Sequence, residues 1–529
     1  MAWVKAAVLS ELREKPVVSK HPPLQIAVFH AKGHVYAIDN RCPHEGYPLA
    51  LGSVNDECVL TCNWHNWKFR LEDGQCLLGG DNVRSYPTRL EGNDVWVDLT
   101  PPSREEARIS IMRGLKKAFD DRDYERICRE IARLHFHGID PKDSIRAALS
   151  WSCSRLEFGV THAHAGAVDW LALAERFSPD FERQLICIAE TFDNMAFDSL
   201  HQPEYPYAHP DKPFERSRFL AAVEGERLSE VEGMVARALV DGVHWPDFEE
   251  AFAAAAFAHY QAFGHAVIYV SKVPDLISSF DESIEYDVLL PLARRLCYGT
   301  REDLIPDFKD YAATLKELAE PRLASSTPKD LEVPFPCNVA KAFGWLAAAL
   351  TTHDVSSVYN ALLKALARNM LHYDASYGAS YDRPVNDNMS WLDFTHGLTF
   401  ANAARRICSR YPQFWRPALL QMACFLGRNA DYVDLKLDSA AWIVHNEEAF
   451  FADAYERMLD HGIDDPVFPV HLLKTASAVE VELRYATPTC REVLLASLNR
   501  YLHSPVKMKH VRRLARQAIT LVSRDFEGQ

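Results

Sequence analysis

Residues 41–67 read RCPHEGYPLALGSVNDECVLTCNWHNW, and this stretch decides the fold of the first hundred residues. It contains two short loops, Cys42-Pro43-His44 and Cys62-Asn63-Trp64-His65, separated by seventeen residues. Each loop pairs one thiol with one imidazole. Around the loops, from Trp3 to Leu99, short alternating apolar runs are broken by glycine-containing turns. This pattern is typical of a small antiparallel β-domain.

The order of the cysteines and histidines indicates which metal group the loops bind. A Rieske-type [2Fe–2S] cluster needs two thiolates on one iron and two imidazoles on the other. A structural zinc site and four unrelated core residues are the alternatives. A zinc finger places its histidines together after its cysteines, whereas here the two types are interleaved as C-x-H and C-x2-H. We therefore predict a [2Fe–2S] cluster held by Cys42, His44, Cys62 and His65.

Residues 3–99 as a whole resemble the Rieske ferredoxins. The similarity extends to His65-Asn66-Trp67-Lys68-Phe69, to Asp73-Gly74 and to Tyr86-Pro87. It implies that Cys42 and Cys62 ligate one iron and that His44 and His65 ligate the other. High-potential Rieske proteins carry an additional disulfide whose cysteines would fall near Tyr47 and Trp64, and neither is a cysteine here. We expect a low reduction potential, as in ferredoxins that supply electrons to oxygenases.

The composition changes after a short linker, Thr100-Pro101-Pro102-Ser103. From Glu105 to about Arg524 the chain is rich in Ala, Leu, Glu and Arg at helical spacing, with few strand-like alternations. The sequence thus predicts a multidomain protein, with a small all-β domain at residues 1–100 and a large all-α domain at residues 105–529. The proline-containing segment 325–336 is a possible division of the helical part into two lobes.

Four predicted helices begin in a similar way, with an aromatic residue, then a histidine, then small residues. The stretches are Phe158-Gly-Val-Thr-His162-Ala-His164-Ala-Gly166, Phe263-Gly-His265-Ala, Phe394-Thr-His396-Gly397 and Phe468-Pro-Val-His471. Small neighbours let helices approach closely, and metal sites in bundle cores are assembled from side chains on several facing helices. A lone histidine on an apolar face is more often a hydrogen-bonded core residue than a ligand. Four of them beside a predicted electron donor favour a metal site.

We therefore predict a second metal centre, a mono- or dinuclear non-haem iron, whose ligands come from His162, His164, His265, His396 and His471. Glu482 lies eleven residues after His471, three helical turns later on the same face, and is the candidate carboxylate ligand. Asp169, seven residues after His162, is another candidate. Both acids are equally compatible with surface charges or helix caps. The sequence assigns no catalytic residue.

The order of these histidine segments resembles the questin oxidase family. The matching pieces are Thr161-His162-Ala163-His164-Ala165-Gly166, His265-Ala266-Val267-Ile268, His396-Gly397-Leu398-Thr399 and His471-Leu472-Leu473-Lys474-Thr475. The resemblance implies oxygen insertion of Baeyer–Villiger type into a polycyclic aromatic ketone or quinone. The fused Rieske domain is a departure from that family's pattern, so the electron route and the substrate can differ.

A competing motif follows the pattern D-x2-H-x4-H, which holds mononuclear iron in Rieske oxygenases. Here Asn194, Asp198 and His201 fit, but position 206 is proline and the next histidine is His209. That family's catalytic domain also contains a large antiparallel sheet, whereas little after residue 105 indicates strand. The alternative is a helix that ends at Asp198, followed by a surface loop that carries His201 and His209.

Composition narrows the partners. The formal net charge of −15 argues against nucleic acid or an anionic membrane as the main partner, and no apolar stretch approaches the length of a membrane span. The N-terminus shows no secretory pattern, so we expect a cytoplasmic protein. No G-x-G-x-x-G fingerprint follows a predicted strand, so electrons are expected from a separate reductase, of flavin-dependent type. A homo-oligomer is possible by analogy with Rieske oxygenases.

The sequence is compatible with two functions. In the first, the protein is a monooxygenase or another oxygenase, in which the cluster supplies electrons to the helical metal for O₂-dependent oxidation of a hydrophobic cyclic or aromatic molecule, by Baeyer–Villiger chemistry or hydroxylation. In the second, it is an electron carrier or redox sensor with a non-catalytic helical binding domain. Metal content distinguishes the two functions.

Overall fold

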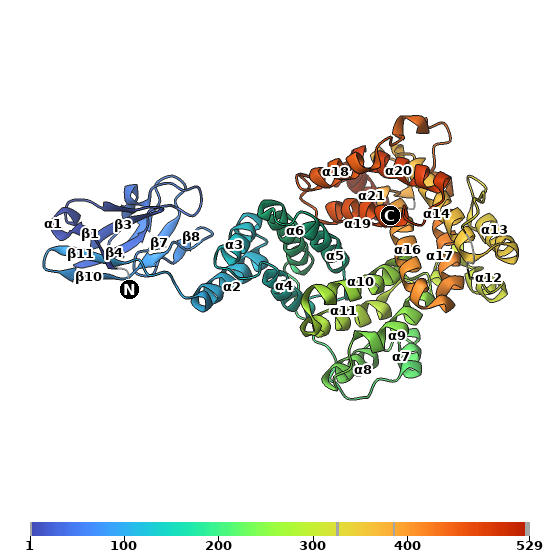
Figure 1. The fold of residues 1–529 in the computed structure, drawn as a ribbon, viewed down its shortest axis with the longest axis horizontal. Helices are drawn as coiled ribbons and strands as arrows, with labels where there is room; N and C mark the ends of the chain where they lie inside the picture. Colours follow the sequence, from blue (N-terminus) through green and yellow to red (C-terminus); the bar gives the residue numbers. More distant parts are fainter. Residues whose placement is uncertain (1–2, 324–326, 385–386, 524–529) are drawn as a thin grey trace. The chain divides into compact units, whose positions relative to one another are not determined.

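The computed structural model describes residues 3–323, 327–384 and 387–523. The chain divides into two units, Met1–Pro141 and Lys142–Gln529. All named strands of the described residues lie in the first unit, and the second unit is built from helices (Figure 1). The predicted fold class, a small all-β domain followed by a large all-α region, is confirmed.

Unit 1 contains three small antiparallel sheets. The first has the order β1 (Trp3–Val8), β11 (Asp94–Asp98), β10 (Thr88–Glu91). The second has the order β2 (Val17–His21), β3 (Leu24–Ala31), β4 (His34–Asp39), β9 (Ser85–Tyr86). The third has the order β5 (Ser53–Val54), β6 (Val59–Thr61), β7 (Lys68–Arg70), β8 (Cys76–Leu78). The short helix α1 (Leu9–Leu12) follows β1.

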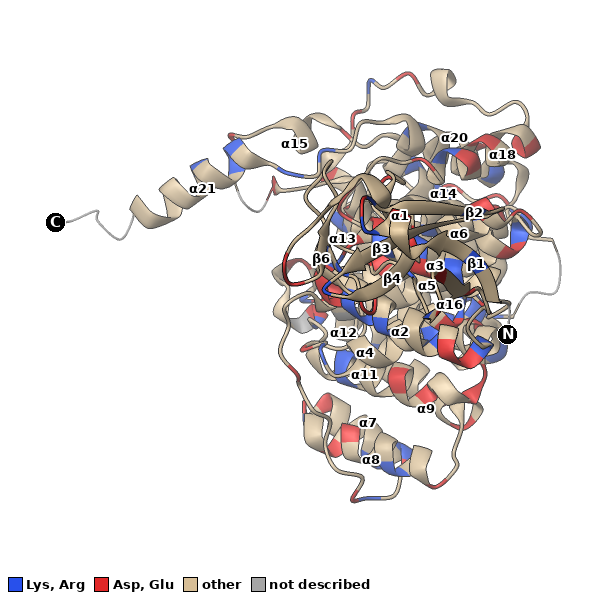
Figure 2. Cartoon of the chain, turned by 90° about the vertical axis from the view of Figure 1, so that its left-hand side faces the viewer, with Lys and Arg blue, Asp and Glu red and all other residues tan. Residues whose placement is uncertain are grey.

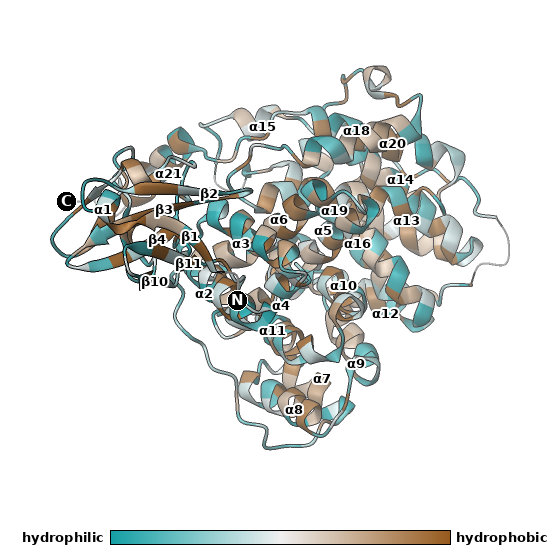
Figure 3. Ribbon diagram, turned by 60° about the vertical axis from the view of Figure 1, so that its left-hand side comes forward, coloured by the Kyte–Doolittle hydropathy of each residue, from teal (hydrophilic) through white to brown (hydrophobic). Residues whose placement is uncertain are grey.

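The β3–β4 hairpin carries the core of this unit. Its two-residue turn, Lys32-Gly33, has positive φ at both positions (50° and 80°), which matches the twist of the flanking strands. Strand β3 is hydrophobic along most of its length (Figure 3), and Phe29 on it is buried. Together with Phe69 of β7, Phe29 belongs to the apolar cluster that also contains the two predicted cysteine ligands. The core of this unit therefore packs against both Cys–His loops.

Two helices complete unit 1: α2 (Arg104–Asp121) and α3 (Tyr124–Phe136). Helix α2 begins at a capping box, in which Ser103 and Glu106 satisfy each other's backbone amides. The unit that holds the sheets thus extends through both helices to Pro141, past the linker at residues 100–103. The division of the helical part into two lobes stays a prediction, and residues 324–326 of that segment lie outside the described residues.

Unit 2 is helical throughout its described part, apart from connecting loops, short 3₁₀ turns and isolated bridges. Its α-helices are α4 (Asp143–Cys153), α5 (His162–Arg176), α6 (Phe181–Ser199), α7 (Arg216–Glu224), α8 (Leu228–Val240), α9 (Trp245–Ala258), α10 (His265–Phe280), α11 (Glu285–Tyr298), α12 (Tyr311–Glu317), α13 (Val339–Thr352), α14 (Val355–Leu371), α15 (Ser376–Ala379), α16 (Trp391–Arg410), α17 (Trp415–Arg428), α18 (Glu447–Met458), α19 (Val467–Glu482), α20 (Pro488–His503) and α21 (Val511–Ser523). Acidic and basic residues are interspersed on surface helices such as α8 and α18 (Figure 2). No helix among the described residues combines the length and apolar character of a membrane span.

Four helices form a closed ring in the middle of unit 2. Helix α5 contacts α10, α10 contacts α16, α16 contacts α19, and α19 contacts α5 (Figure 1). Small residues permit the close approach, since a Cβ on Gly166 of α5 would lie 2.9 Å from the side chain of Val470 on α19. Gly264, just before α10, has φ +79°, and a Cβ there would meet Phe400 of α16 at 2.7 Å. The ring is the scaffold of the second candidate site.

Two candidate metal centres

The two cysteine–histidine loops of unit 1 have the same backbone construction. The amide of Cys42 donates to the carbonyl of Tyr47 at 2.8 Å, and the amide of Gly46 donates back to the carbonyl of Cys42 at 2.8 Å. In the second loop the amide of Cys62 donates to Trp67 at 2.7 Å, and that of Asn66 donates to Cys62 at 3.0 Å. Gly46 and Asn66 both have positive φ, which glycine and asparagine tolerate best. The loops are therefore equivalent turns that present their side chains at one tip.

The four side chains converge at that tip. The rings of His44 and His65 lie 4.5 Å apart, edge to face, and His44 stacks on Trp67 at 4.8 Å. Cys42 and Cys62 are both buried. Burial raises the pKa of the Cys42 thiol to about 11, although the backbone amides of His44 and Glu45 hydrogen-bond to it and oppose the shift. A buried thiol becomes a thiolate when a metal supplies compensating charge.

One orphaned atom tests whether this tip fits an iron–sulfur cluster. The Nδ1 atom of His44 is buried and has no hydrogen-bond partner in the structure. Buried polar atoms are normally satisfied, and iron would complete this one. Two buried thiols and two adjacent imidazoles are the donor set of a Rieske [2Fe–2S] cluster, so the residues fit that group.

The position of His44 depends on a chain of contacts that reaches α3. Its stacking partner Trp67 lies against Gly79 and Gly80, and a Cβ on Gly79 would lie 2.4 Å from the Trp67 ring. The next residue, Asp81, is fully buried. Its carboxylate pairs with three arginines of α3, at N–O distances of 3.2, 2.5 and 3.4 Å for Arg126, Arg129 and Arg133 respectively. The sequence did not predict this network, because no local pattern around Gly79 and Gly80 indicates which residues the following aspartate meets.

In unit 2, the four-helix ring brings four of the predicted histidines together. His162 and His265 are the first residues of α5 and α10, and His396 and His471 lie in the first two turns of α16 and α19. The Nε2 atoms of His162 and His265 are 3.0 Å apart, and those of His396 and His471 are 3.1 Å apart. The rings of His265 and His396 lie 4.4 Å apart and those of His162 and His471 4.7 Å apart. We call these four residues the histidine cluster.

Hydrogen bonds orient the rings of the cluster. The Nδ1 atom of His471 bonds to the backbone carbonyl of Val467 at 2.6 Å, and that of His265 bonds to the carbonyl of Ala262. His396 hydrogen-bonds to the backbone of Leu392. Such bonds leave Nε2 free to bind a metal. Ala262 has a strained left-handed backbone (φ 44°), an outlier of the kind that gathers at functional sites.

The electrostatics of the cluster favour neutral imidazoles. Burial lowers the pKa of His265 to about 3, and neighbouring Lys474 and Arg295 reinforce the effect. Burial, together with neighbouring cationic groups, also lowers the pKa of His162, His396 and His471. Neutral imidazole is the form that binds metals. Ligand atoms of His162, His265 and His396 all lie within 4.8 Å of one another, a spacing that a single ion can bridge.

The other predicted ligands lie elsewhere. His164 accepts a hydrogen bond from the backbone of Thr161 in a capping box, and burial lowers its pKa to about 4. The Glu482 carboxylate is occupied by Tyr359, Asn402 and Arg405 at 2.8 to 3.0 Å. Asp169 forms an ion pair with Lys272 at 2.8 Å. None of the three belongs to a group of metal-capable side chains in the described part of the chain.

The competing motif is not assembled in the described residues. Asp198 accepts a hydrogen bond from Thr161 Oγ1 at 2.5 Å, and His201 and His209 are exposed on a loop. Asp198 belongs to neither of the two groups of three metal-capable side chains found there.

Sequence reasoning also missed Lys474, one turn after His471. Its Nζ atom is buried and has no hydrogen-bond partner. Burial lowers the pKa of Lys474 to about 7, with Asp169 opposing the shift and Lys272 adding to it. A lysine three residues after a core-facing histidine on a helix is the signal that would have located it.

The fold and the loop geometry of unit 1 define a Rieske-type electron-transfer module, and the comparisons agree. A family model described as "Rieske [2Fe-2S] domain" matches residues 2–87. The 3-phenylpropionate/cinnamic acid dioxygenase ferredoxin subunits of Escherichia coli (strain K12) and Shigella flexneri are each 36% identical over 76 residues, which is 14% of this chain and 72% of theirs. The chain therefore belongs to the Rieske [2Fe–2S] family, through this N-terminal region.

Solved structures match the same region. The ferredoxin of carbazole 1,9a-dioxygenase from Nocardioides aromaticivorans IC177 is 24% identical, with a TM-score of 0.18, over 19% of this chain and 100% of that one. Dicamba monooxygenase bound to dicamba is 30% identical, with a TM-score of 0.18, over 19% of this chain and 35% of that one.

Proposed function

We propose that this protein is an oxygenase in which a Rieske cluster and a non-haem metal, most simply iron, act in one chain. The observation that carries the proposal is the convergence of His162, His265, His396 and His471 from four different helices onto one buried point. When bound, a Rieske cluster supplies single electrons and a histidine-held iron activates O₂ for insertion into an organic molecule. We infer a hydrophobic cyclic or aromatic substrate.

The chain's own residues support this in three ways. The Nδ1 atoms of His265 and His471 bond to backbone carbonyls, and the Nε2 atoms of the four histidines lie in two close pairs. The ring of helices around them shields the centre from water, because His471 is fully buried and His396 is buried as well. Unit 1 belongs to the family whose members here are ferredoxin subunits of dioxygenases, which suits electron supply to an oxygenase.

A second function is favoured by one observation. The relatives that match unit 1 are separate ferredoxin subunits, so the chain is alternatively an electron carrier or redox sensor whose helical unit binds a partner. In that case the histidine cluster holds no metal and its rings are core residues. In both functions the electrons arrive from a separate reductase, which we expect to be flavin-dependent.

Metal content separates the two functions. Iron and acid-labile sulfide are counted per chain in protein purified without oxygen. The oxygenase predicts the two irons and two sulfides of the cluster plus additional metal. Fully sulfide-loaded protein with no metal beyond the cluster would leave only the carrier function.

Two matched variants assign the additional metal. His396→Ala removes a cluster imidazole and is expected to abolish the extra metal while sulfide stays unchanged. His164→Ala removes a buried histidine two positions from His162 that lies outside the cluster, and should keep the extra metal. Equal metal loss in both variants would mean that the helical unit had merely been destabilised, which parallel melting curves would reveal.

A further inference from the structure

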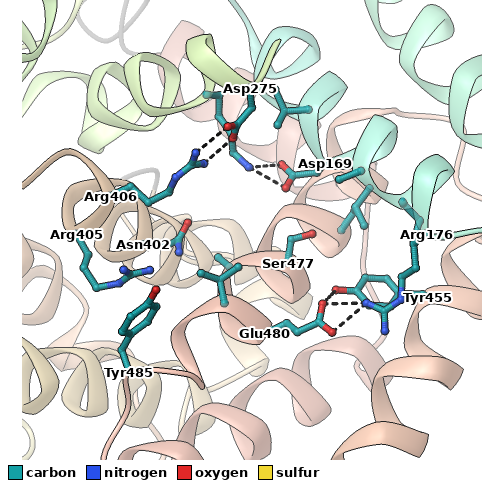
Figure 4. A pocket seen from close by; sticks show the side chains of 17 residues that line it. Asp169, Arg176, Asp275, Asn402, Arg405, Arg406, Tyr455, Ser477, Glu480 and Tyr485 are labelled. Carbon is teal, nitrogen blue, oxygen red and sulfur yellow. Dashed lines mark hydrogen bonds and ion pairs between the residues drawn. The ribbon is translucent and has the colours of Figure 1, made fainter. Parts of the chain in front are cut away.

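A cleft of about 370 Å³ opens on the same four helices that carry the histidine cluster (Figure 4). Its lining includes Asp169 and Arg176 from α5, Lys272 and Asp275 from α10, and further residues from α16 and α19. The cleft therefore belongs to the same four-helix bundle as the histidine cluster, whose members lie near the first turns of those helices.

The spacing along each helix places the cleft beyond the cluster in one direction. Asp169 and Lys272 each lie seven residues after a cluster histidine, on α5 and α10. Asn402 and Ser477 each lie six residues after one, on α16 and α19. Seven residues are two turns and about 10 Å of helix, on the same face. All four helices therefore run from a histidine layer toward the cleft.

One ion pair in the lining of the cleft joins α5 to α10. The Nζ atom of Lys272 contacts both carboxylate oxygens of Asp169, at 2.8 and 2.9 Å, and Asp169 is buried. Lys272 also lines a second, small cavity of about 10 Å³, together with Tyr269 and His164. The ring of Tyr269 lies 5.6 Å from that of His265. A continuous line of residues thus leads from the cleft through Lys272 and Tyr269 to the histidine cluster.

We propose that this cleft binds the organic substrate and that the Asp169–Lys272 ion pair is the gate between the cleft and the histidine cluster. The proposal rests on the oxygenase function above and adds where the substrate binds and what must move. A cavity of about 10 Å³ admits a single water at most, so the substrate reaches the cluster only when Lys272 swings away.

The lining also indicates the chemical class of the occupant. Two cation–aromatic pairs face the cleft, Arg405 over Tyr485 at 3.8 Å and Arg176 over Tyr455 at 4.5 Å. Four cationic and three acidic side chains line it, and the fourth cation, Arg405, pairs with Glu482 behind the lining. The stacked guanidinium and phenol planes suit a planar aromatic molecule that carries carbonyl or hydroxyl oxygens. The volume is at the small end of ligand pockets, which suits two or three rings.

The test measures how fast a planar chelator, 1,10-phenanthroline, removes the helical metal from the holoprotein. The Rieske cluster is followed separately by its visible circular dichroism. Ser477→Trp fills the cleft and should slow extraction about tenfold, equivalent to ~1.4 kcal/mol of added barrier. The double variant Asp169→Asn, Lys272→Met removes both gate charges together and should accelerate extraction by a similar factor. The wild-type rate should rise with chelator concentration.

A control variant keeps the result interpretable. Val240→Trp adds the same bulk at an exposed position on α8, outside the cleft, and should have no effect. Extraction rates unchanged in Ser477→Trp and in the double variant would overturn the cleft and gate while leaving the helical metal, and with it the oxygenase, in place. Absence of any metal beyond the cluster removes both proposals.

Discussion

The two candidate centres differ in how far apart their ligands lie along the chain. The four predicted ligands of the [2Fe–2S] cluster in unit 1 come from two turns within residues 42–65, and the backbone bonds of those turns are local. The four histidines of unit 2 come from residues 162, 265, 396 and 471, on four helices. The first centre therefore depends on loop geometry, and the second depends on how helices pack. Variants that disturb the loops of unit 1 should leave the histidine centre intact, and variants that disturb helix packing in unit 2 should leave the loops intact.

The largest expected effect is the loss of one centre alone. Cys62→Ser removes a thiolate ligand, and we expect loss of the whole [2Fe–2S] cluster, with its sulfide, because one of four ligands is missing. The metal of the histidine cluster should remain at wild-type content. Metal and sulfide analysis of the variant provides the measurement. Joint loss of both metals would contradict the independence of the two centres.

The next largest effect tests whether α3 stabilises the [2Fe–2S] centre of unit 1. Asp81→Asn removes the buried charge that pairs with the arginines of α3, and breaking a buried pair costs about 3–5 kcal/mol. We expect the cluster's visible circular dichroism to melt at a lower temperature. Asp73→Asn is the matched control, because Asp73 pairs with Arg70 at the surface and such pairs contribute up to about 1 kcal/mol. Equal shifts in the two variants would remove α3 as a support of the cluster.

A smaller effect tests helix packing around the distant centre. Gly166→Ala places a methyl group 2.9 Å from Val470, and overpacking of this kind costs about 1–3 kcal/mol. The free energy of unfolding of unit 2 and its metal content should both fall. At Gly397 the new Cβ would be 3.1 Å from a leucine methyl of Leu366, so Gly397→Ala should cost less. The reverse order of the two variants would mean that α5 and α19 do not need this close approach.

The smallest effect concerns pH and leaves the four histidines untouched. Burial lowers the pKa of His259, but hydrogen bonds to Glu302 and Glu224 outweigh burial and raise the pKa above its ordinary value. Because the pKa of His259 is higher in the folded state, its protonation stabilises that state. This contribution is fully present below the pKa of His259 in the unfolded state, about 6.5, and is lost as pH rises through its pKa in the folded state. His259→Gln should therefore lower the free energy of unfolding at acidic pH, by less than about 1 kcal/mol, and should lower it by a smaller amount at alkaline pH. Denaturant titrations at several pH values measure the difference.

The sequence predicted the Rieske domain and the two Cys–His loops that meet at one tip, because interleaved C-x-H and C-x2-H loops carry their geometry in local spacing. For the second centre, the repeated aromatic–histidine–small pattern identified the four helices that meet. It did not separate His162 from His164, which lie two residues apart and so face different sides of one helix. Glu482 follows His471 on the same face, yet Arg405 and Tyr359 occupy its carboxylate. Which neighbour a buried acid meets depends on packing that no local pattern encodes.

The three arginines of α3 place the C-terminal boundary of the electron-transfer module beyond its last strand. A fragment ending at Leu99 would keep every strand of the Rieske fold but would lose all three guanidinium partners of the fully buried Asp81. The loop that holds Trp67 against His44 would then rest on an uncompensated charge. A form of this electron-transfer module that keeps these ion pairs has to include α3, which ends at Phe136. Fusing it to another host protein calls for carrying both helices with the strands.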